Sequence, residues 1–68
     1  MKVVAKLESN GETVYEKPCS GDDEVGTAVC EAMNEAVATA HECDEPVLVE
    51  ATWEDGSTAL WRITVKAL

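Results

Sequence analysis

Two segments near the start of the chain, Lys2–Glu8 and Glu12–Lys17, are rich in Val, Leu, Thr and Tyr, which predicts two β-strands. Asn10-Gly11 lies between them, and this dipeptide is the strongest short-range indication of a β-hairpin. A three-residue loop would set Glu8 opposite Glu12, a repulsive like-charge pair. We therefore expect a two-residue turn that aligns Leu7 with Val14 and places Lys6 beside Tyr15.

A second hairpin is predicted from Val47–Trp53 and Thr58–Ala67, which are separated by Asp55-Gly56. A two-residue loop would mix the apolar and polar faces of these strands. A three-residue loop, with Gly56 in the left-handed conformation, makes the apolar faces coincide. We therefore expect Trp53 opposite Ser57 and Val49 opposite Trp61.

One helix, Gly21–Cys43, is predicted between the hairpins. Ser20 and Asp23 have the spacing of a capping box, and Gly26 indicates a close approach to a strand. The fold class is thus α+β: a single ββαββ domain over residues 1–68, with a four-stranded sheet and one helix packed on one face as a two-layer sandwich. The apolar helix arc expected to face the sheet consists of Val25, Val29, Ala32, Met33, Ala36, Val37 and Ala40.

Charge is unevenly distributed along the chain. Fourteen acidic residues against five basic ones give a net charge of −9, and residues 18–61 contain eleven Asp or Glu and no Lys or Arg. Such a field repels nucleic acid and anionic membranes and attracts basic protein surfaces. We therefore expect neither direct nucleic-acid binding nor membrane association. The charged start of the chain does not fit a signal peptide, so a cytoplasmic location is expected.

A stripe of carboxylates is predicted opposite the apolar arc of the helix, from Glu24, Glu31, Glu35 and Glu42. None of these has a Lys or Arg three or four positions away, so the usual pairing within a helix is absent. The common interpretation of such a run is a solvated face, but a surface of one sign costs stability through self-repulsion. We therefore interpret it as a partner-binding surface formed by Asp22, Asp23, Glu24, Glu31, Glu35, Glu42, Glu50, Glu54 and Asp55.

No catalytic, cofactor or metal motif is found. Cys30 and His41 lie about 16 Å apart along a helix, too far for a nucleophile–base pair. A zinc site from Cys19, Cys30, His41 and Cys43 lacks the close ligand pairs that such sites use. We expect a protein that is not an enzyme and binds no cofactor or metal, with the three cysteines as reduced, small packing residues and His41 as a partly buried one.

In length, architecture and charge, though in no sequence motif, the chain resembles the small acidic proteins of phages and mobile elements, including anti-CRISPR proteins and other DNA mimics. The resemblance implies an inhibitor that occupies the nucleic-acid-binding surface of a CRISPR effector complex, with carboxylates in place of phosphates. Its partner would be basic, and a phage-encoded inhibitor would act in the host cytosol.

Two alternatives remain open. One is a de novo designed ββαββ scaffold, although three free cysteines, Gly26 within the helix and few lysines are unusual for a design. The other is a small homodimeric interaction module. In that case exposed Val4, Leu60 and Leu68 on the sheet face away from the helix, or a free strand edge, would form the contact.

Overall fold

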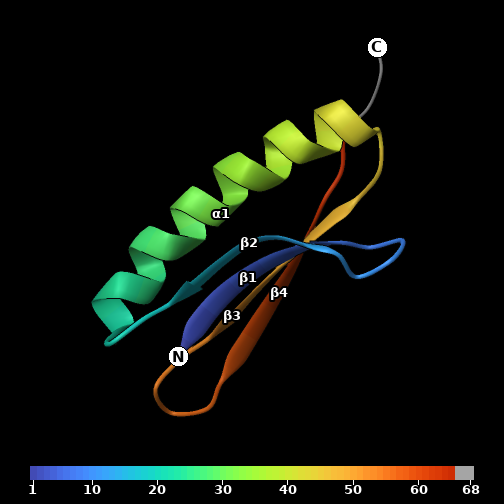
Figure 1. Ribbon diagram of the computed structural model, residues 1–68. Helices are drawn as coiled ribbons and strands as arrows, with labels where there is room; N and C mark the ends of the chain where they lie inside the picture. The colour runs from blue at the N-terminus through green and yellow to red at the C-terminus, as the bar shows by residue number, and fades with distance from the viewer. Residues whose placement is uncertain (66–68) are drawn as a thin grey trace.

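The computed structural model describes residues 1–65, and it confirms the two-layer ββαββ fold (Figure 1). The strands pair antiparallel in the order β2-β1-β3-β4, so the first strand of each hairpin lies in the middle of the sheet. The helix lies along one side of the sheet as the second layer. The elements are β1 (Lys2–Leu7), β2 (Thr13–Pro18), α1 (Asp22–Cys43), β3 (Val47–Thr52) and β4 (Thr58–Ile63).

The second hairpin has the predicted register. Val49 pairs with Trp61, and the Trp53 N–H donates to the Ser57 carbonyl at 2.9 Å across a three-residue loop. Gly56 has a φ of 87°, the left-handed conformation that this loop requires. The strand ends at Ile63 rather than at Ala67, and residues 66–68, including Leu68, lie outside the described residues.

The predicted register of the first hairpin is wrong. Lys6 pairs with Thr13 and Ala5 with Tyr15, and the register shifts between these pairs at a bulge. A one-residue shift turns every side chain to the opposite face of a sheet. In the predicted register Glu16 would face the acidic helix; in the observed one Tyr15 and Lys17 face it instead. The observed register therefore avoids repulsion between carboxylates.

The core is formed by small side chains. On the helix Val25, Ala28, Ala32, Ala36 and Ala40 are buried, facing buried β1 and β3 residues that include Val3, Val47 and Val49. Three expectations for the helix face are corrected: Ala28 is an unexpected core residue, Val29 and Met33 are only partly buried, and Val37 is 44% exposed. Because the alanines lie directly under the helix axis, larger residues at its sides remain at the rim.

The helix ends also differ from expectation. Gly21 is the N-cap and makes no side-chain cap hydrogen bond, so the Ser20–Asp23 capping box is not formed. Instead, Glu24 accepts hydrogen bonds from the backbone N–H of Ser20 at 3.0 Å and from its hydroxyl at 2.8 Å. Gly26 is exposed, and no atom lies within 4 Å of a Cβ added there, so it does not mark a close approach to a strand. The helix ends at Cys43, followed by Asp44 in the left-handed conformation.

Candidate functional site

The helix is the acidic layer of the protein. It carries six of the fourteen acidic residues, Asp22, Asp23, Glu24, Glu31, Glu35 and Glu42, and no Lys or Arg. At 3.6 residues per turn, the four glutamates of the predicted stripe lie about 100° from the centre of the buried arc. The stripe therefore runs along one side of the helix, above β2, rather than opposite the buried arc.

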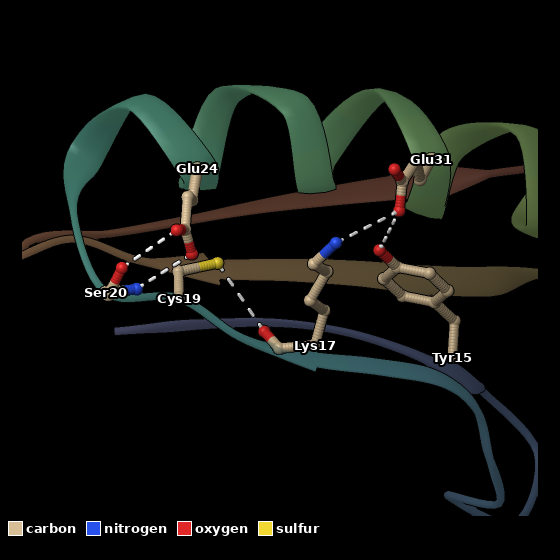
Figure 2. Close-up of polar contacts among 6 residues, drawn as sticks. All are labelled: Tyr15, Lys17, Cys19, Ser20, Glu24 and Glu31. Carbon is tan, nitrogen blue, oxygen red and sulfur yellow. Dashed lines mark hydrogen bonds and ion pairs between the residues drawn. The ribbon is translucent and has the colours of Figure 1, made fainter.

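Two side chains from β2 reach this stripe at Glu31 (Figure 2). The Tyr15 hydroxyl donates a hydrogen bond to a Glu31 carboxylate oxygen at 2.8 Å, and the Lys17 ammonium lies 3.9 Å from the same oxygen. Burial of the phenol raises the pKa of Tyr15 to about 12, and the bond to Glu31 adds to this effect. Glu31 thus connects the helix to an edge strand and is not a simple solvent-facing carboxylate.

Sequence reasoning missed Tyr15 and Lys17 as neighbours of the stripe. Their alternation in Thr13–Pro18 places both on one face, but choosing the face required the correct hairpin register. The signal available in the sequence was charge. The observed register directs Lys17 toward the helix glutamates, whereas the predicted register directs Glu16 there and so brings like charges together.

Glu24 is also engaged by a neighbour. The backbone and hydroxyl hydrogen bonds from Ser20 stabilise the carboxylate and lower its pKa (Figure 2). They tie the segment that precedes the helix to its first turn. The carboxylate is fully exposed beyond these bonds, so it remains accessible to a basic partner.

A second acidic group forms where the β3–β4 loop meets the start of the helix. The Asp22 carboxylate accepts a hydrogen bond from the Glu54 N–H at 3.2 Å, which holds the loop against the helix end. Asp55 accepts hydrogen bonds from the Ser57 hydroxyl and backbone N–H, and these bonds lower its pKa. Asp22, Asp23, Glu54 and Asp55 are all exposed.

The nine predicted binding residues therefore do not form one surface. Glu35 and Glu42 have no hydrogen-bond or ion-pair partner among residues 1–65 and continue the helix stripe. Glu50 lies apart from the rest, because alternation along β3 places it on the sheet face away from the helix. We define the acidic helix surface as the six helix acids together with Glu54 and Asp55.

Most of the basic residues lie on the opposite layer. Lys2 and Lys6 alternate with the buried residues of β1, and Arg62 alternates with the partly buried residues of β4, so all three lie on the uncovered sheet face. Lys2 approaches Glu16 at 3.7 Å, and the Arg62 Nε donates to Glu8 at 2.6 Å. The two layers thus differ in charge: the helix is acidic, and the uncovered sheet face is mixed.

The cysteines and the histidine, which are the side chains able to act as nucleophiles or metal ligands, lie apart from one another, and most of them are exposed. Cys30, His41 and Cys43 are exposed on the helix, which corrects the expectation that they are packing residues; Cys19 is partly buried. Among residues 1–65 no group of three His, Cys, Asp or Glu side chains is arranged to hold a metal ion. A hollow of about 230 Å³ lies beside the helix start and is lined by Lys17, Asp23, Glu24 and Thr27. Ligand pockets are commonly about 300 Å³ or larger, and no hydrogen bond joins Thr27 to Asp23 or Glu24 in this hollow.

No family model matches the chain, and neither a curated protein nor a solved structure matches it. In the described part of the chain no helix is long and apolar enough to cross a membrane.

Proposed function

We propose that this protein acts by binding and not by catalysis: it is an inhibitor whose acidic helix surface occupies the nucleic-acid-binding surface of a basic partner. The specific form of the proposal is an anti-CRISPR protein that competes with DNA for a CRISPR effector complex. The observation that supports it is the charge difference between the layers, with six acidic residues and no Lys or Arg on the helix.

The state of these carboxylates favours recognition by Lys and Arg. Among residues 1–65, Glu31 is the only helix carboxylate with an ammonium within 4 Å, and its partner Lys17 is itself about half exposed. Glu35 and Glu42 project from the same side of the helix and are about 10 Å apart along its axis at 1.5 Å per residue. Partner cations can bind them without first displacing an internal cation, so the desolvation cost is low and long-range attraction speeds encounter.

Charge alone gives the helix a weaker attraction than DNA. A 22-residue helix is about 33 Å long, and DNA of that length carries about nineteen charges, whereas this helix carries six. An inhibitor of this kind therefore needs shape-specific contacts in addition to charge. The loop acids Glu54 and Asp55 widen the surface at one end and supply part of that shape.

The test is displacement of labelled double-stranded DNA from a panel of purified CRISPR effector complexes. We expect the protein to displace DNA from at least one complex. The double variant Glu35→Lys/Glu42→Lys should lose affinity mainly through slower association, and added salt should reduce the difference. Because neither side chain has a hydrogen-bond or ion-pair partner among residues 1–65, the variant should keep its helical circular-dichroism signal.

The matched control is Glu12→Lys/Glu16→Lys on the first hairpin. It changes the net charge equally, from −9 to −5, at exposed positions away from the helix. Equal loss of affinity in both variants would show that only total charge matters and would refute the helix as the binding surface. No displacement from any complex, even at low salt, would refute the anti-CRISPR assignment.

A further inference from the structure

The two edge strands of the sheet differ in how they are protected against pairing with another chain. β2 carries a bulge, ends in Pro18 and places the charges of Glu16 and Lys17 along its length, and such features block edge pairing. β4 has no proline and no bulge, and Arg62 is its only charged residue. An unprotected strand at the edge of a sheet is a template for another strand.

The β4 edge also carries little charge. Residues 56–65 contain one charged residue, although 28% of the chain is charged. The exposed large apolar side chains among the described residues are Leu60, 61% exposed on β4, and Val37, 44% exposed. Val37 lies on the side of the helix away from Glu31, because the two differ by about 120° around the axis at 3.6 residues per turn. Exposed apolar groups are thus concentrated toward β4.

The free edge of β4 has backbone N–H and C=O groups that can form hydrogen bonds with another strand. The Trp53–Ser57 pair is hydrogen-bonded, and hydrogen-bonded and non-hydrogen-bonded pairs alternate along an antiparallel ladder. The N–H and C=O groups of Ala59, Trp61 and Ile63 therefore point toward β3. Those of Thr58, Leu60 and Arg62 point to the free edge.

From this edge we infer that β4 pairs antiparallel with β4 of a second copy of the chain. In such a symmetric pair one residue of β4 lies opposite its own copy, and side chains on the helix side of one sheet must lie opposite side chains on the helix side of the other. The residue at the centre can then be Leu60, Trp61 or Arg62. Centring on Arg62 sets two guanidinium groups opposite each other and is disfavoured. Centring on Trp61 sets Leu60 opposite the partner's Arg62 and small Ala59 opposite the partner's Ile63, and it brings no two cations together.

The chain is self-complementary in this Trp61-centred register. No two like charges face each other along the paired strands, and the helix glutamate stripe lies above β2, at the opposite edge of the sheet from the contact. The product is a continuous eight-stranded sheet with both helices on one face. This inference depends on the edge strand and is independent of the proposed inhibitor function.

The test is the mass of the full chain in solution, measured by light scattering during size-exclusion chromatography and by sedimentation. We expect twice the 7.3 kDa of one chain at high micromolar concentration. Amide exchange should show protection of the Leu60 and Arg62 N–H groups that disappears on dilution. Added salt should strengthen the dimer by screening two copies of charge −9, whereas it weakens binding to a basic partner. The two proposals are thus distinguishable.

Substitution at position 60 tests the register. Leu60→Lys sets a lysine opposite the partner's Arg62 at each of the two symmetric sites. This like-charge pairing should weaken the dimer about tenfold. Leu60→Glu creates opposite-charge pairs at the same sites and should retain the dimer. Val4→Lys, on the uncovered face of central β1, is the control and should have no effect.

A single-chain mass at every concentration would overturn the inference. A dimer lost with Val4→Lys but kept with Leu60→Lys would overturn it as well, because contact would then run through the sheet face. Equal weakening by Leu60→Lys and Leu60→Glu would refute the register.

Discussion

Replacing Gly26 by alanine is expected to stabilise the protein. Gly26 is the fifth residue of α1, is exposed, and has open space where a Cβ would be added. Glycine within a helix costs about 1 kcal/mol relative to alanine, because the unfolded chain loses more conformational entropy. With no clash to offset this gain, we expect Gly26→Ala to raise the free energy of unfolding by about 0.5–1 kcal/mol. That corresponds to a rise in Tm of about 2–8 °C for a domain of this size.

Gly56→Ala is the matched control. It adds the same methyl group, also into open space, but at a residue with φ of 87°. An L-residue there costs about 1–2 kcal/mol, so the free energy of unfolding should fall. Urea and thermal unfolding followed by circular dichroism measure both changes. If Gly26→Ala lowers the unfolding midpoint, or both variants shift it in the same direction, then backbone conformation does not decide the effect and the reasoning fails.

Three further results are expected. Tyr15 has a folded-state pKa of about 12 against an ordinary 10.0, so the folded state keeps its proton longer. Stability should therefore be complete below pH 10 and decline as the pH rises toward 12, and Tyr15→Phe should remove this decline in urea unfolding. A thiol reagent should react rapidly with exposed Cys30 and Cys43 in the native protein and more slowly with partly buried Cys19; three equally slow thiols would contradict their exposure. Raising salt to physiological strength should raise the urea midpoint by screening the helix carboxylates, and Glu35→Gln/Glu42→Gln should show a smaller gain.

The parts of the fold that the sequence predicts are those with strong local patterns. The second hairpin was predictable in detail because only one loop length superimposes its apolar faces and Gly56 supplies the left-handed residue. The first hairpin was not, because the choice between registers depends on contact between β2 and the helix, which no local rule contains. Strand order was likewise undetermined, since the β1–β3 pairing joins segments distant in sequence.

The candidate site was predicted in composition but not in arrangement. The acids and the absence of helix cations follow directly from the sequence. Their position depends on where the buried arc is centred, and the prediction gave weight to Val37 where the structure buries Ala28. Helix periodicity alone does not distinguish a closely packed alanine from a valine at the rim, because the rotation of the helix about its axis depends on how it packs against the sheet.

The alanines that face the sheet have a consequence for the position of the helix along its own axis. Ala28, Ala32, Ala36 and Ala40 recur every four residues, so displacing the helix by one turn would present nearly the same surface to the strands. Valines are the largest fully buried residues, and larger apolar side chains such as Met33 and Trp61 pack only partly buried against this core. Polar contacts at defined points, Glu31 with Tyr15 and Asp22 with the Glu54 backbone, therefore help to set the axial position. Some carboxylates that make the helix acidic thus also help to determine its alignment on the sheet.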